Sequence, residues 1–177
     1  MNQNEPDRPR ARAGAVMLGA ALALACLGPA RATDLAPPEL TGAPGQGQHA
    51  AIVQAGHFNQ ALIEQRHGAS QFAELVQDGF NNQLQALQSG HHNFLDARQS
   101  GADNVASITQ SGALNRVDLA QLGFDNRANV EQIGHGHHAL VEQFGNSNRA
   151  DIVQGISAPN VVVRQYGDHI VTTLIQY

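Results

Sequence analysis

The sequence contains one cysteine, Cys26, and no lysine. Cys26 lies in an N-terminal segment that we expect to be removed, so the remaining chain would have no thiol for a disulfide, a catalytic nucleophile or a metal site. A lipoprotein acylated at Cys26 is the disfavoured alternative, because Ala23 stands where such sites usually have leucine. Removal of the segment leaves six arginines and thirteen acidic residues, a net charge of −7. No basic stripe is left for nucleic acid or anionic lipid, and we expect neither as a partner.

The N-terminal segment has the three parts of a secretory signal peptide. Arginines within the first twelve residues precede the apolar run AVMLGAALALACL at 15–27, and Ala30 and Ala32 then form an A-x-A cleavage motif. The run is too short to span a membrane. We therefore expect a signal peptide at residues 1–32, cleaved after Ala32. Residues 33–47 are rich in proline, glycine and small polar residues, which predicts a flexible leader.

Glutamine recurs at a fixed interval through residues 48–177. Twelve glutamines are spaced 11 residues apart, except for an interval of 12 between Gln65 and Gln77. Glycine generally follows two residues after the glutamine and asparagine five residues after it, which gives the unit Q-x-G-x-x-N-x-[AVL]-x-[ILVA]-x-Q. Eleven residues would fit three turns of helix, but a glycine and an asparagine in every period disfavour one. Repetition this regular predicts a stacked repeat architecture.

Between each asparagine and the next glutamine the polarity alternates, as it does along a β-strand. In the segment 126–132, NRANVEQ, Ala128 and Val130 share a face with the terminal amides, and charged side chains lie on the opposite face. The pattern predicts seven-residue strands joined by four-residue turns. Two such units must face each other to bury their apolar faces, so 22 residues make one coil. We expect an all-β, two-sheet β-solenoid of cross-β, amyloid-like type with about six strand-turn-strand coils.

The inward glutamines and asparagines are the candidate structural site. If equivalent strands stack about 4.8 Å apart, like amides lie in register and form ladders that donate and accept along the stack. The expected ladder residues are Gln77, Asn82, Gln88, Asn93, Gln99, Asn104, Gln110, Asn115, Gln121, Asn126, Gln132, Gln143, Asn148 and Gln154. The chain must reverse between strands, where glycine tolerates the positive φ of tight turns. The expected turn glycines are Gly79, Gly90, Gly101, Gly112, Gly123, Gly134 and Gly145.

Other kinds of site have weaker support in the sequence. The nine histidines include His135, His137 and His138, but no carboxylate or thiol completes a metal set at ligand spacing. The acidic residues are scattered singly over the outward face and mixed with arginine, unlike the carboxylate-lined groove of a β-helix enzyme. We therefore expect no enzyme activity, no metal and no cofactor. A soluble β-solenoid that binds ice or sugar remains an alternative, because a fold alone does not set function.

The repeat resembles that of the curlin family, the subunits of the curli amyloid fibres of Gram-negative bacteria. Curlin repeats read S-x5-Q-x4-N-x5-Q, and matching pieces lie at Gln77, Asn82 and Gln88, at Gln99, Asn104 and Gln110, and at Gln121, Asn126 and Gln132. The resemblance covers about residues 48–177. The leading serine is mostly replaced here. The asparagine position is occupied instead by Gln71, His137, Pro159 and Ile170 in four repeats.

The resemblance implies a secreted structural amyloid subunit, exported through the curli outer-membrane pore with its accessory factors and assembled outside the cell by self-templated strand addition. The product would be a cell-surface fibre, or fimbrium, that supports adhesion and the biofilm matrix. The family has a major subunit that builds the fibre and a minor subunit that nucleates it. Irregular repeats, outward arginines and the divergent end IVTTLIQY, at 170–177, favour the minor subunit, with the major subunit as its partner. The terminal QY is also a feature of major subunits, which keeps the major subunit as the alternative.

Overall fold

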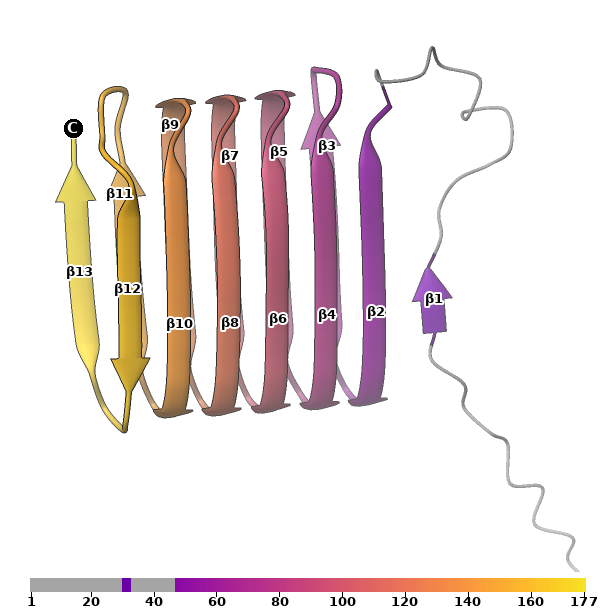
Figure 1. Ribbon diagram of the computed structural model, residues 1–177. Helices are drawn as coiled ribbons and strands as arrows, with labels where there is room; N and C mark the ends of the chain where they lie inside the picture. The colour runs from indigo at the N-terminus through magenta and orange to yellow at the C-terminus, as the bar shows by residue number, and fades with distance from the viewer. Residues whose placement is uncertain (1–29, 33–46) are drawn as a thin grey trace, which may run out of the picture.

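The chain folds as a β-solenoid in a computed structural model that describes residues 30–32 and 47–177 (Figure 1). All regular elements among these residues are strands, which confirms the expected all-β class. The described part of the chain has no helix that is long and apolar enough to cross a membrane. The expected signal peptide, apart from residues 30–32, and the expected leader, apart from Gly47, lie outside the described residues.

The strands alternate between two sheets that face each other (Figure 1). Sheet A has the order β1 (Ala30–Ala32), β2 (His49–His57), β4 (Phe72–Phe80), β6 (Phe94–Ala102), β8 (Arg116–Phe124), β10 (His138–Asn146) and β12 (Val161–Tyr166). Sheet B has the order β3 (Gln60–Arg66), β5 (Gln83–His91), β7 (Val105–Ala113), β9 (Arg127–His135), β11 (Arg149–Gln154) and β13 (Val171–Gln176). All neighbouring strands are parallel except β1 and β2, which are antiparallel. From β2 onward, one strand of each sheet makes a coil.

Equivalent positions of successive coils are neighbours in the sheets. Gln99 pairs with Gln121, and Gly101 pairs with Gly123, a separation of 22 residues in both cases. The first coil is one residue longer, because Gln54 pairs with Gln77. The expected two-sheet solenoid of about six 22-residue coils is therefore confirmed.

Most strands are longer than the repeat pattern predicted. The strands from β4 to β10 each contain nine residues, and the connections between them contain two. The prediction of seven-residue strands and four-residue turns is therefore wrong. In β8 the three residues after Gln121 continue to pair with β10, as far as Phe124 opposite Asn146. In the regular coils, backbone pairing thus extends past the glutamine and through the glycine that follows it.

The core lies between the two sheets and consists of aliphatic side chains. Strand alternation turns two aliphatic residues of most strands inward, between the inward glutamine and asparagine. The fully buried members include Ala73, Leu75, Leu95, Ala97, Val117, Val130, Ala139, Val141, Ala150 and Ile152. Burial of these side chains supplies the hydrophobic contribution to folding. It also forces the flanking amides into a region without water.

Candidate functional site

The inward glutamines form two continuous columns, one along each sheet. In sheet A, Gln99 Nε2 donates to Gln121 Oε1 at 2.7 Å and to the carbonyl oxygen of Gln83, in the facing sheet, at 3.0 Å. The same two bonds recur for each repeat glutamine from Gln77 to Gln143, with Nε2–Oε1 distances of 2.7 to 2.9 Å. These side chains are at most 2% exposed. Each column is therefore a buried hydrogen-bonded chain that satisfies its own amides.

In both glutamine columns the side-chain amides all donate in the same direction, and this hydrogen bonding changes at the C-terminal coil. Each Nε2 group donates toward the coil that follows in the sequence. Gln154 Nε2 instead donates to the Pro159 carbonyl oxygen at 2.6 Å, and Gln176 Oε1 is buried without a hydrogen-bond partner. The sheet B column therefore stops between β11 and β13. In sheet A the column reaches Gln165, whose Nε2 donates to Thr172 Oγ1 at 2.9 Å.

Asparagines form further columns at the connections between strands. Asn104 Nδ2 donates to the Ser100 carbonyl oxygen of its own coil at 3.3 Å and to the Gly123 carbonyl oxygen of the next coil at 3.0 Å. Its Oδ1 accepts from the backbone N–H of Asn126 at 3.1 Å. The same two donations are made by Asn59, Asn82, Asn93 and Asn115. Each of these asparagines supplies two donors to backbone carbonyls, one within its coil and one in the next.

The structure places all fourteen predicted ladder residues at buried positions in the glutamine and asparagine columns. The four residues that replace asparagine behave differently from one another. Gln71 Nε2 donates to the Gly90 carbonyl oxygen at 2.6 Å and to the Arg66 carbonyl oxygen at 3.2 Å, while its Oε1 is buried without a partner. The Ile170 side chain has no polar group, and only backbone atoms of Ile170 form hydrogen bonds, such as the N–H that donates to Asn148 Oδ1 at 2.9 Å. Gln71 thus keeps the two donations of an asparagine and loses the acceptor.

The predicted turn glycines are the last but one residues of their strands, and the chain reverses after them. A Cβ on Gly101 would overlap the carbonyl oxygen of Gly123 in the next coil, and Gly101 has a φ of 113°. Glycine is therefore required by the close approach of backbone between coils. The reversal uses a residue two positions later, such as Asp103 with φ 58° or Leu114 with φ 59°. Among residues other than glycine, Asn and Asp tolerate this left-handed region best, which is a signal that the sequence analysis missed.

The outward face of sheet A carries ion pairs and an aromatic column. Arg116 pairs with Asp118 at 2.6 Å, and its guanidinium lies over the ring of Phe94 at 4.3 Å from the centroid. Phe94 in turn stacks on Phe72 at 4.9 Å between centroids. Burial raises the pKa of Asp118, but hydrogen bonds from Arg116 and His138 outweigh it and hold the pKa below its ordinary value. These partly exposed contacts order the surface and contribute little to the free energy of unfolding.

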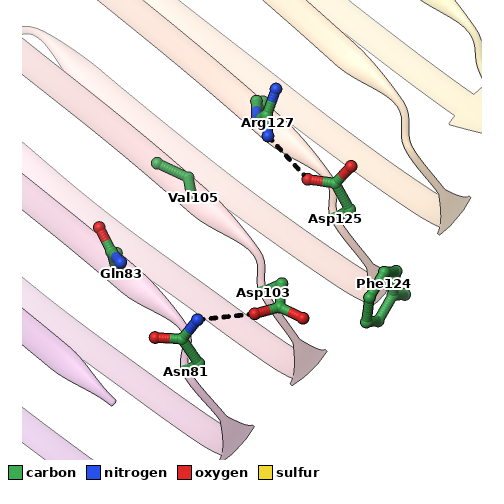
Figure 2. A pocket seen from close by; sticks show the side chains of 7 residues that line it. All are labelled: Asn81, Gln83, Asp103, Val105, Phe124, Asp125 and Arg127. Carbon is green, nitrogen blue, oxygen red and sulfur yellow. Dashed lines mark hydrogen bonds and ion pairs between the residues drawn. The ribbon is translucent and has the colours of Figure 1, made fainter. Parts of the chain in front are cut away.

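A surface hollow of about 330 Å³ lies along the connections that lead from a strand of sheet A to the next strand, in sheet B (Figure 2). Its carboxylates are already bonded, because Asp103 accepts from Asn81 at 2.6 Å and Asp125 pairs with Arg127 at 3.0 Å. Figure 2 shows both pairs lying along the row of stacked connections. Within residues 47–177, no three His, Cys, Asp or Glu side chains gather in a way that could hold a metal ion. The hollow is therefore lined by a repeating row of side chains that are bonded to one another.

Comparison with known protein families gives two matches to one family. Residues 90–123 and residues 123–155 each match the family model of the curlin associated repeat. The two segments lie in the middle of the solenoid, where both glutamine columns are continuous. No curated protein and no solved structure matches the chain. The two repeat matches support a relation to the curlin family.

Proposed function

We propose that the chain is a structural subunit of extracellular curli fibres. The observation that carries the proposal is the match of residues 90–123 and 123–155 to the curlin associated repeat, in a solenoid whose buried columns all run along one axis. Coils that already stack as parallel strands have the arrangement of a cross-β fibre. A further copy can continue the same backbone and amide bonding at the end of the stack.

The ends of the stack favour the addition of further copies. At the C-terminal end, β12 and β13 have a paired strand on one side only, as β3 has at the other end. β2 is covered by the three residues of β1. Cleavage after Ala32 would remove β1 and leave β2 as an open edge. An unpaired strand edge is a template for strands of another chain, so both ends of the cleaved chain would be competent for assembly.

The proposed export, location and partners of the chain are based on its relation to the curlin family. A signal peptide at residues 1–32 would direct export, and the flexible leader at 33–47 would remain outside the solenoid. Passage through the curli outer-membrane pore with its accessory factors would bring the chain to the cell surface. There it would self-assemble and associate with the major curli subunit, in fibres that support adhesion and the biofilm matrix. The outward face carries no basic stripe, and nucleic acid is not a proposed partner.

The last coil favours the minor, nucleating subunit over the major one. Its strand β13 turns Val171 and Ile175 outward, and these side chains are 67% and 53% exposed. Exposed apolar residues on a terminal strand mark an attachment surface or a template. The preceding connection is irregular, with Pro159 at the position of the column asparagine. This coil is therefore the proposed contact to the cell surface and to the partner subunit.

The proposal is tested by seeding with full-length and shortened chains. The chain from Thr33 to Tyr177 is expected to form fibres that bind amyloid dyes and to shorten the lag time of a more regular curlin-repeat partner. Deletion of residues 159–177 is expected to leave β-rich assemblies that no longer seed the partner and no longer stay at the cell surface. The lag times and cell fractionation measure both effects.

A milder variant separates the apolar face from the loss of a whole coil. Replacing Val171 and Ile175 together with serine is expected to weaken seeding while the chain still assembles. Unchanged seeding and surface retention by the deletion variant would favour the major subunit. A chain that stays monomeric for days at neutral pH would favour the soluble, ligand-binding solenoid.

A further inference from the structure

The apolar core is covered along the two sheets and partly open at the two ends of the stack. Four aliphatic side chains that pack against the core remain partly exposed: Ile52, Ala61, Ile63 and Leu174. The first three lie in the first coil, and Leu174 lies in the last. In the coils between them, the inward aliphatic residues are buried. A further layer of strands at either end would therefore bury more of the core.

The glycines of sheet A indicate what this layer is. An added Cβ would overlap the carbonyl oxygen of the glycine in the next coil at five of them: Gly56, Gly79, Gly101, Gly123 and Gly145. The sixth, Gly167 in the last coil, has a similar backbone conformation, with a φ of 124°. Among the described residues, the atom nearest to a Cβ added there is Ile170 Cδ1 at 3.8 Å, an ordinary contact. Gly167 thus keeps the conformation that admits a carbonyl oxygen from a following coil.

We propose that Gly167 receives the carbonyl oxygen of Gly56 from a second copy of the chain. The inference rests on the proposed function and specifies how two subunits join. The last coil of one copy stacks on the first coil of the next, with β12 parallel to β2 of the second copy. In the register that the coils use within one chain, Gln165 then lies opposite Gln54 of the second copy.

The inward side chains of the two end coils fit this register. Val163 of the last coil would lie against Ile52 of the second copy, and Leu174 would lie against Ile63. Within one chain the same column pairs Ile52 with Leu75. Both new contacts join aliphatic side chains of similar size. The junction would therefore bury the partly exposed ends of the core.

The direction of the glutamine columns specifies which ends meet. Gln54 Nε2 donates into the stack, to Gln77 at 2.6 Å, which leaves its Oε1 on the side of the open end. In the last coil, Gln165 Nε2 keeps its bond to the Arg149 carbonyl oxygen of the facing sheet, at 2.8 Å. It also donates to Thr172 Oγ1 at 2.9 Å, where the regular coils have the next glutamine. Gln54 Oε1 of a second copy would take that place.

Like ends are poorly matched by comparison. Two first coils would present glutamine acceptors to each other, and two last coils would present donors. A junction between unlike ends repeats without closing and gives a filament. The two tips of this filament differ, because one ends in β12 and β13 and the other in β2 and β3. A change at Gly167 is therefore expected to affect the two tips differently.

Gly167→Ala tests the junction through the two tips of a fibre. At the β12 tip of a wild-type fibre, the variant can bind through its unchanged first coil and then presents a last coil blocked by the new Cβ. At the β2 tip the variant cannot bind, and wild-type chains keep adding. When a minor fraction of the variant is mixed with wild-type chains, single-fibre fluorescence microscopy is expected to show growth that stops at one tip and continues at the other.

Gly136→Ala is the matched control for backbone strain. Gly136 also has a positive φ, no atom lies within 4 Å of an added Cβ, and the residue is far from both ends of the stack. The control variant is expected to leave growth at both tips unchanged. Amide hydrogen exchange in β4 to β10 checks that both variants keep the fold.

Cysteine cross-linking tests the register without changing Gly167. The chain from Thr33 to Tyr177 contains no cysteine. Ala51 and Val162 are outward residues that would be neighbours at the junction, and strands about 4.7–4.9 Å apart allow a disulfide. Within one copy their strands are five strand spacings apart, roughly 24 Å, so the disulfide can form only between copies. Oxidised fibres of the double variant Ala51→Cys, Val162→Cys are expected to dissolve into disulfide-linked polymers, and each single variant into monomers.

Three results would overturn the inference. The first is growth with Gly167→Ala that is equal at both tips, whether slowed or unchanged. The second is disulfide-linked dimers from Val162→Cys alone, which would mean that two last coils meet. The third is fibres of the double variant without cross-links. All three are measured on fibres that form, so the proposed function would stand. Failure of the wild-type chain to form fibres would contradict the proposed function and this inference together.

Discussion

Replacing Gly112 with alanine is expected to prevent the regular stacking of coils and to destabilise the folded chain by at least about 3 kcal/mol. The new Cβ would overlap the carbonyl oxygen of Gly134 in the next coil. Gly112 also has a φ of 121°, a conformation that alanine rarely adopts. The neighbouring atoms are backbone of a paired strand, so they cannot move aside without breaking hydrogen bonds on both sides. Chemical denaturation and the rate of fibre formation would measure the loss.

Gly136→Ala is the matched control for backbone strain alone. Gly136 also has a positive φ, of 74°, but no atom lies within 4 Å of an added Cβ. It occupies the reversal position, where other coils have residues such as Asp125 or Leu114. We expect a loss of about 1 kcal/mol, at the lower end for a strained residue. Equal effects of Gly112→Ala and Gly136→Ala would show that contact between the coils is not what requires glycine.

Replacing Gln110 with alanine is expected to destabilise the folded chain by breaking one of the two glutamine columns. Gln110 donates to Gln132 and to the Phe94 carbonyl oxygen, and it accepts from Gln88. Its removal leaves a donor of Gln88 and acceptors of the other two groups buried without partners, at about 1–3 kcal/mol each. The free energy of unfolding and the lag time of assembly should both respond.

Gln85→Ala provides a control with the same change of side chain. Gln85 lies on β5 and is exposed on the outward face of the sheet. A surface substitution of this kind usually changes stability by less than about 0.5 kcal/mol. Comparable losses in the two variants would mean that the buried glutamine column does not stabilise the stack.

The fold was predictable because the 11-residue repeat constrains the strands, their register and the packing of their apolar faces. The alternation around Ala128 and Val130 indicated strands, and the 11-residue interval required neighbouring strands to lie in register. Such a pattern leaves few ways to bury the apolar face. The strand ends were predicted wrongly, because the positive φ of Gly101 was assigned to chain reversal. Glycine is required at this position by a contact between coils, which a single repeat does not reveal.

The details of the site were only partly accessible from the sequence. The positions of Gln71 and His137 as departures from asparagine were visible, but the carbonyl oxygens that these side chains contact come from two coils. Leu114 adopts a left-handed conformation for which its side chain gives no signal. The aromatic stack of Phe72 and Phe94 needed the register between coils before the rings could be placed together.

X-ray diffraction from aligned fibres of the chain from Thr33 to Tyr177 tests the central claim most directly. Stacking of coils within and between copies along one axis predicts a meridional reflection at about 4.7–4.8 Å and an equatorial reflection near 10 Å, the spacings between strands and between sheets. The fibres should form without a partner and grow from fragments of themselves. Fibres without the meridional reflection, or a chain that forms none, would contradict the account of this protein as a self-stacking curli subunit.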